Sequence, residues 1–175
     1  GLAGPWAENA KVGDLLQFSG PGGKYQPDPE ADWHLLVGDE AAIPAIGAVL
    51  AAMSEDAVGH ALIEVATAAD EWKLPAPKGI EITWLHRGGE FTPETTVLER
   101  AVKGLPWREG RVQAFVHGER ESMKSLRKYL HDERGVDRAN LSLSAYWAYG
   151  RGEDAFQAEK SLPVGQIYPE AGLQY

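Results

Sequence analysis

The sequence predicts an α/β fold in three layers, with a mostly parallel five-stranded sheet that carries helices on both faces. Two observations support this prediction. Short apolar runs recur along the chain, and between them lie segments whose apolar residues repeat at helical spacing. Buried strands that alternate with helices are typical of parallel sheets, because the connecting helices cover both faces.

The first strand and the first helix are separated by a glycine and two acidic residues. Trp33–Val37 is the apolar run, and Gly38-Asp39-Glu40 ends it. Apolar residues then follow on one helical face, at Ile43, Ile46, Gly47, Leu50 and Ala51. Since proline fits only the first turn of a helix, Pro44 places the helix start near residues 41–42.

The second and third strands are expected at Ala61–Ala66 and Ile80–Leu85. A helix is predicted over Thr92–Lys103. Its start, Thr92-Pro93-Glu94, combines a capping residue, a proline and an acidic residue in the first turn.

The fourth and fifth strands are expected at Val112–Val116 and Leu141–Ala148. Between them, a helix over Glu119–Arg134 ends at Gly135. The apolar residues on one face of that helix are Met123, Leu126 and Leu130. After the fifth strand, the turn Gly150-Arg151-Gly152 leads into an acidic, helix-prone segment.

The composition excludes several kinds of site and partner. The chain has 175 residues, a formal charge of −9 and no cysteine. The acidic balance argues against nucleic-acid binding, which needs a basic surface. Without cysteine there is no disulfide, thiolate metal site or cysteine nucleophile, and the five histidines lack metal-motif spacing. With neither a long apolar run nor a signal peptide, we expect a cytoplasmic protein without membrane insertion.

Ligands of open parallel sheets bind beyond the carboxyl ends of the strands. At the first strand end the candidate residues are Gly38, Asp39, Glu40, Ala42 and Pro44. A helix N-terminus there can bind a phosphate, although the two carboxylates would repel it unless they cap the helix or meet a ribose. Simple capping is the alternative. The segment contains no GxGxxG motif.

Two further strand ends carry charged residues and glycine. Arg87, after His86, lies on a glycine turn, where it either makes two hydrogen bonds to a phosphate or is simply exposed to solvent. The fourth strand ends in His117, Gly118 and Glu119. The glycine would let a planar ring approach the backbone, while the histidine contacts a ligand or caps a local turn.

The fifth strand ends in large rings. Tyr146, Trp147 and Tyr149 lie within four residues, and Arg151 follows on the glycine turn. Such rings form either a wall for a flat ligand or an aromatic plug of the core.

These strand ends resemble the siderophore-interacting protein family, a branch of the ferredoxin-reductase-like flavoenzymes. The matching stretches are GDEAAIPAI (Gly38–Ile46), WLHRGG (Trp84–Gly89), FVHGE (Phe115–Glu119) and LSLSAYWAYGRGE (Leu141–Glu153). They occur in the family's order and span roughly residues 31–160. Residues 4–23 resemble the closing strand of the flavin-binding barrel that precedes this domain in the family.

The resemblance implies a cytoplasmic ferric-siderophore reductase, in which NAD(P)H reduces FAD and the flavin reduces siderophore-bound Fe(III). We expect residues 1–23, with a strand at Leu15–Phe18, to close a truncated flavin-binding barrel, and residues 24–31 to be a linker. Residues 32–160 would form the NAD(P)H-binding domain, and residues 161–175 a tail that wraps it or remains loose. FAD would be held mostly by a flavin-binding domain in cis or in trans.

Carried over by position, the resemblance implies a role for each strand end. The Asp39–Pro44 turn would face the pyrophosphate, and His117–Glu119 would border the nicotinamide. His86 and Arg87 would lie near the adenosine ribose and any 2′-phosphate, which favours NADPH over NADH.

The resemblance also implies contacts to flavin and substrate. The rings of Tyr146, Trp147 and Tyr149 would lie by the flavin, and Arg151 by a phosphate or the substrate. Lys160 would help attract an anionic ferric siderophore.

Two other interpretations of the sequence stay open. One is a module without turnover that binds a siderophore or a protein partner through the exposed aromatic end. It is favoured by the acidic pair Asp39-Glu40 at the supposed phosphate turn. The other is a structural domain whose strand-end residues are only caps and plugs.

Overall fold

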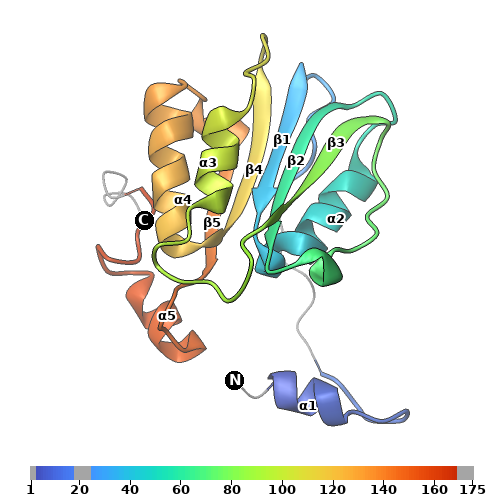
Figure 1. Ribbon diagram of the computed structural model, residues 1–175, viewed down its shortest axis with the longest axis vertical. Helices are drawn as coiled ribbons and strands as arrows, with labels where there is room; N and C mark the ends of the chain where they lie inside the picture. The colour runs from blue at the N-terminus through green and yellow to red at the C-terminus, as the bar shows by residue number, and fades with distance from the viewer. Residues whose placement is uncertain (1–2, 18–24, 169–175) are drawn as a thin grey trace.

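The computed structural model describes residues 3–17 and 25–168. Its centre is a sheet of five strands in the order β3-β2-β1-β4-β5 (Figure 1). The strands are β1 (Trp33–Gly38), β2 (Val58–Val65), β3 (Gly79–His86), β4 (Val112–Glu119) and β5 (Leu141–Trp147). Every neighbouring pair is parallel, so the predicted α/β fold is confirmed.

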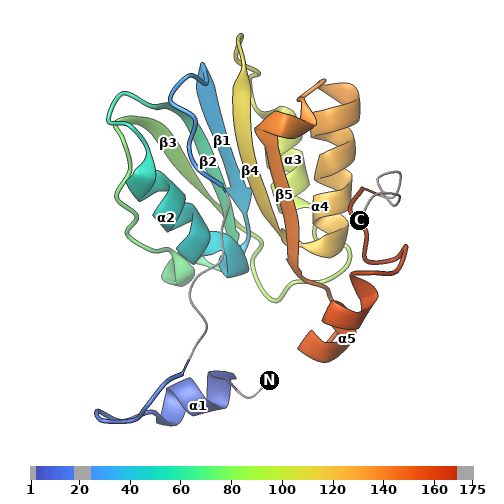
Figure 2. The ribbon, with the colours of Figure 1, turned by 180° about the vertical axis from the view of Figure 1, so that it is seen from behind.

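Helices cover both faces of the sheet. α2 (Ile43–Ala52) lies on one face, and α3 (Val97–Gly104) and α4 (Arg120–Arg127) lie on the other (Figure 1 and Figure 2). Because successive side chains of a strand point to opposite faces, β1 contributes to both cores. Leu35 belongs to the core under α3 and α4, and Leu36 to the core under α2.

Short helices complete the described chain. α1 (Ala3–Asn9) precedes the sheet, and α5 (Glu153–Glu159) forms in the acidic segment after β5, as predicted. Single turns of 3₁₀-helix occur at Glu40–Ala42, Ala68–Asp70 and Arg138–Asn140.

The helix predicted from Thr92 begins five residues later, at Val97, so its predicted start was wrong. Thr92 and Thr95 close a separate turn, in which the Thr95 N–H donates to the Thr92 carbonyl at 2.9 Å. The α3 start is set instead by β2. The buried Glu64 carboxylate accepts a hydrogen bond from the Leu98 N–H at 3.1 Å and caps the helix.

The helix predicted over Glu119–Arg134 is present in two parts. α4 continues directly into a π-helical segment, Lys128–Glu133. Gly135 follows with φ +71°, a conformation that suits glycine and ends the helix where predicted.

The strand predicted at Leu15–Phe18 is not formed by residues 15–17, and Phe18 lies outside the described residues. A strand needs a neighbour for its backbone hydrogen bonds, whereas residues 4–17 are all exposed. α1 occupies part of this segment and was not predicted from the sequence. The assignment of residues 1–23 to a flavin-binding barrel stays a prediction.

Residues 161–168 of the tail wrap the domain. The Lys124 ammonium donates to the Val164 carbonyl at 2.7 Å, and Ile167 packs against two apolar clusters. The Tyr168 ring lies 4.6 Å from the Arg138 guanidinium. The rest of the predicted tail lies outside the described residues.

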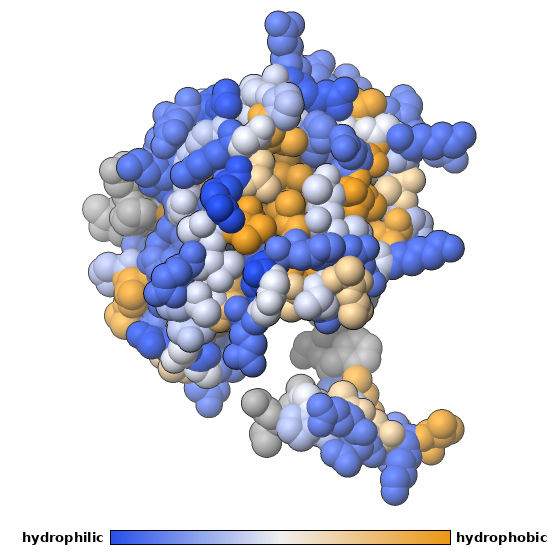
Figure 3. Space-filling model, in the orientation of Figure 1, coloured by the Kyte–Doolittle hydropathy of each residue, from blue (hydrophilic) through white to orange (hydrophobic). Residues whose placement is uncertain are grey.

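The surface that carries α3 and α4 has apolar residues over the central strands and a mostly hydrophilic rim (Figure 3). In the described ranges, no helix combines the length and apolar character that a membrane crossing requires.

The contact between β1 and β2 predicts a severe effect of one small substitution. Gly59 has φ +151°, and a Cβ there would clash with the His34 backbone. We expect Gly59→Ala to lower the free energy of unfolding by about 3 kcal/mol, because strain and overpacking add. The control is Gly104→Ala at the end of α3, where a Cβ would have nothing within 4 Å. Equal midpoints of the two variants in urea unfolding would contradict the prediction.

Candidate functional site

A buried carboxylate joins three strand ends. Asp39, directly after β1, is 3% exposed. One of its oxygens accepts from the Ala41 N–H at 3.0 Å. The other accepts from the Glu119 N–H at the end of β4 and from the Trp147 indole N–H at the end of β5, both at 2.8 Å. Burial raises the pKa of Asp39, and these three hydrogen bonds act in the opposite direction.

Capping therefore describes Asp39 correctly, since it is the N-cap of the 3₁₀ turn Glu40–Ala42. The position of Asp39 also explains why residue 118 is glycine. A Cβ on Gly118 would lie 2.8 Å from an Asp39 carboxylate oxygen. The close approach that this glycine permits is that of a carboxylate.

Arg87 is neither free nor exposed to solvent. Its side chain is 9% exposed, and its Nη2 lies 2.5 Å from a Glu40 oxygen. On the other side, its Nη1 lies 3.5 Å from Oε1 of Glu64. Burial raises the pKa of Glu64 to about 7, although the Leu98 N–H and Arg87 favour its charged form.

His86 points away from this arginine. Its Nε2 lies 2.7 Å from a Glu71 carboxylate oxygen, and both side chains are partly exposed. The pair is at the outer edge of the sheet, because β3 is an edge strand.

His117 lies in an aromatic environment near the end of β4. Its ring stacks on Phe115 with centroids 3.7 Å apart, and Tyr146 meets it edge-on at 5.0 Å. Nε2 lies 2.9 Å from the Ser142 hydroxyl, and Nδ1 is buried without a hydrogen-bond partner. Burial lowers the pKa of His117 to about 4, so the ring is neutral at pH 7.

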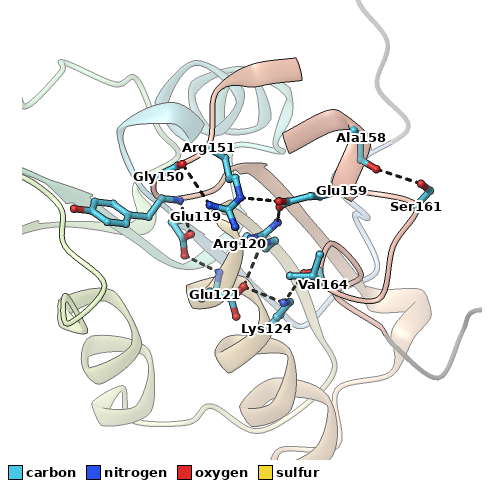
Figure 4. Close-up of polar contacts among 11 residues, drawn as sticks. Glu119, Arg120, Glu121, Lys124, Gly150, Arg151, Ala158, Glu159, Ser161 and Val164 are labelled. Atoms are coloured by element: carbon cyan, nitrogen blue, oxygen red, sulfur yellow. Dashed lines mark hydrogen bonds and ion pairs between the residues drawn. The ribbon is translucent and has the colours of Figure 1, made fainter. Parts of the chain in front are cut away.

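Glu119 ties β5 to α4 (Figure 4). It is the N-cap of α4, and one oxygen accepts from the Glu121 and Ser122 N–H groups at 2.6 and 3.1 Å. Its other oxygen accepts from the Tyr149 N–H at 3.1 Å. Glu119 is buried, with 3% of the residue exposed, and its hydrogen bond to Tyr149 fixes the aromatic segment to the start of α4.

The aromatic segment Tyr146–Tyr149 is only partly buried in the core. Tyr149 is 48% exposed. Phe91 lies against it and against Trp147, with ring centroids 6.1 and 5.0 Å apart. A cavity of about 390 Å³ opens beside these rings, and Glu99 and Thr96 are among its lining residues.

Arg151 and Lys160 make their contacts with α5. The Arg151 Nε lies 2.6 Å from Glu159, whose other oxygen lies 2.5 Å from Nη1 of the buried Arg120 (Figure 4). The Lys160 ammonium lies 4.7 Å from the centroid of the Phe156 ring.

The structure thus brings three of the four predicted strand ends together through Asp39, and Arg87 joins the third strand end to them through Glu40. Three residues that contact these strand ends were not predicted from the sequence, namely Glu64, Phe91 and Ser142. Glu64 gave a usable signal, since it is the one acidic residue in the apolar run Ala61–Ala66.

Comparison with known proteins identifies the family of this chain. The family model "Siderophore-interacting protein" matches residues 31–150. The chain belongs to the siderophore-interacting protein family.

Three proteins illustrate the similarity. An uncharacterized protein of Mycobacterium tuberculosis is 48% identical over 91% of this chain and 60% of its own length. The ferric vibriobactin reductase ViuB of Vibrio cholerae is 37% identical over 94% of this chain and 61% of its own. A siderophore utilization protein from T. fusca superposes with a TM-score of 0.77 at 40% identity, over 87% of this chain and 58% of that one.

The chain spans about three fifths of the length of the Mycobacterium tuberculosis protein and of ViuB. Its all-parallel sheet has the ferredoxin-reductase-like fold of the structurally similar siderophore-interacting proteins.

Asp39→Asn is expected to destabilise the protein by about 1–3 kcal/mol, because an amide cannot accept all three hydrogen bonds. Urea unfolding measures the loss, and the emission of Trp147 should change with it. The control is Asp154→Asn, the same substitution at an exposed residue of α5. Equal midpoints for the two variants would mean that the Asp39 hydrogen bonds contribute little.

Neutral His117 makes the stability depend on pH. Its folded pKa is depressed from 6.5 to about 4, so its contribution is present above pH 6.5 and is lost as the pH falls towards 4. Between pH 7 and pH 5 we expect the unsubstituted protein to lose about 1–2 kcal/mol more stability than His117→Gln does. Both proteins share the opposite contribution of Glu64, whose pKa is raised to about 7. Urea unfolding of both proteins at these pH values tests this, and identical losses would refute it.

Proposed function

We propose that this chain is the NAD(P)H-binding domain of a siderophore-interacting flavin reductase, which reduces ferric siderophores and so releases their iron. The observation that carries the proposal is the edge where Asp39 joins three strand ends, beside neutral His117 and its aromatic neighbours. The family membership and the relationship to ferric vibriobactin reductase support it.

The residues of this edge fit a nicotinamide dinucleotide. Asp39 turns its charge inward onto three N–H donors, which lessens its repulsion of a pyrophosphate at the Asp39–Pro44 turn. His86 and Arg87 offer polar groups for the adenosine ribose. The unpartnered Nδ1 of His117 offers a hydrogen-bonding atom for the carboxamide, with Gly118 and Glu119 beside it.

The flavin is proposed to approach the face of β4 and β5 that α2 leaves uncovered (Figure 2). Phe115, His117 and Tyr146 lie on this face, with Tyr25 edge-on to Phe115 at 5.1 Å. Phe115 and His117 are buried, so the half-buried Tyr25 and Tyr146 are the rings of this group that a planar partner can reach. A flavin-binding domain, in cis or in trans, would hold FAD against them.

With both cofactors bound, the flavin would supply the redox chemistry, taking a hydride from NAD(P)H and giving one electron to each of two ferric siderophores. His117 stays neutral at pH 7, so it adds no positive charge beside a nicotinamide that becomes cationic on oxidation. The aromatic rings beside His117 would orient the reacting ring and exclude water from it.

The remaining assignments concern the substrate and its compartment. Lys160 is exposed and would attract an anionic ferric siderophore. Arg151 is exposed but pairs with Glu159, and it is proposed to contact a phosphate or the substrate. The proposed location is the cytoplasm, where reduced nicotinamide dinucleotides are available.

A module that binds a siderophore or a partner without turnover is the second candidate. The observation that favours it is that Arg87 and Arg151, both expected at phosphates, pair with carboxylates. It would bind a ferric siderophore and no dinucleotide.

Calorimetric titration of the chain with NADH and with NADPH tests the proposal. We expect saturable binding of at least one dinucleotide, competed by ADP-ribose. His117→Ala should weaken binding several-fold, because it removes the nitrogen offered to the carboxamide. His131→Ala is the control, since the His131 ring contacts the Val136 carbonyl instead. If ferric siderophore binds while neither dinucleotide does, the second candidate replaces the first.

A further inference from the structure

Arg87 is the cation on which a preference for NADPH would depend, and two carboxylates flank it. Glu40 holds its Nη2 at 2.5 Å, and Glu64 lies 3.5 Å from its Nη1. Only 9% of the arginine side chain is exposed. A bidentate contact to a phosphate needs two accessible N–H groups on one edge of the guanidinium. Glu40 holds Nη2, and Nε and Nη1 are buried, so no such pair is open to a ligand.

The charges of this cluster also disfavour a phosphate. One guanidinium faces two carboxylates, and in the described residues neither carboxylate forms an ion pair with a second lysine or arginine. A phosphate monoester carries about −1.5 to −2 charges at pH 7. A 2′-phosphate would therefore have to displace Glu40 and then lie close to its carboxylate.

A 2′-hydroxyl meets the opposite situation. The Glu40 side chain is 37% exposed, so its carboxylate is accessible to a ribose while one oxygen holds Arg87. In dinucleotide-binding sheets, an acidic residue that accepts a hydrogen bond from the 2′-hydroxyl selects NAD, and an arginine accommodates the 2′-phosphate of NADP. Here both residue types are present, and the acidic one restrains the arginine.

We propose that Glu40 determines dinucleotide choice through its ion pair with Arg87, and that the site takes NADH in preference to NADPH. This inference rests on the proposed function, and it reverses the preference expected from Arg87 alone. Glu64 contacts Arg87 on the side of the guanidinium away from Glu40. It is 2% exposed and fixed by the Leu98 N–H, so it holds Arg87 in place when Glu40 is changed.

The test compares Glu40→Gln with the unsubstituted chain in calorimetric titrations with NADH and NADPH. The unsubstituted chain is expected to bind NADH more tightly. In Glu40→Gln the affinity for NADPH should rise roughly tenfold, because the arginine becomes available and one negative charge is removed. The affinity for NADH should fall slightly, since an amide is a weaker acceptor for the 2′-hydroxyl.

Two further variants separate this role from a structural one. Glu40→Asp keeps the charge and should keep the preference for NADH. Glu81→Gln is the matched control, the same substitution on β3 at an exposed carboxylate that pairs with His60, and it should leave the ratio of the two affinities unchanged.

The titrations test the inference and the proposed function separately. Tighter binding of NADPH by the unsubstituted chain overturns the inference, and so does an unchanged ratio in Glu40→Gln, while the proposed function survives both results. If neither dinucleotide binds to any variant, the proposed function fails and the inference fails with it.

Discussion

The carboxyl edge of this sheet depends on one desolvated carboxylate. Asp39 is buried, and a buried carboxylate without hydrogen bonds is costly. Three donors from three different segments offset that cost. Each donor is therefore fixed in position by the same charge, and the loops after β1, β4 and β5 cannot move independently of one another.

The end of β5 is shaped to reach this carboxylate. Gly118 pairs with Ala145, but the next residue of β4, Glu119, pairs with Trp147, so Tyr146 is an extra residue in β5. Such an irregularity redirects the side chains that follow it. The indole N–H of Trp147 reaches Asp39, while Tyr146 stays beside His117. Both the structural anchor and the aromatic face thus follow from one inserted residue.

The sequence was sufficient for the features that local patterns determine. The apolar runs and helical periodicity identified five strands and the helices between them, and parallel strands necessarily place their carboxyl ends together. The hydrogen-bond partners of the strand-end residues could not be predicted from the sequence. Asp39 bonds to residues 80 and 108 positions away, and no local signal encodes such a distance.

The start of α3 shows the same limit. Thr92-Pro93-Glu94 has the ordinary signals of a helix start, yet α3 begins at Val97, next to the carboxylate of Glu64 on β2. A tertiary cap outweighed the local one, because a buried carboxylate needs a donor and the first N–H groups of a helix need acceptors.

Charge pairing at this edge gives Glu40 and Glu64 different roles. Arg87, Arg120 and Arg151 each pair with glutamate. Pairing lowers the cost of burying a guanidinium but cancels the positive potential that would attract a phosphate. Glu64 is fixed, since removing it would leave Arg87 buried beside an uncapped helix. Glu40 is more than a third exposed, so a ligand can reach its carboxylate. Ligand discrimination by charge therefore belongs to the outer member of the pair, and stability of the fold to the inner one.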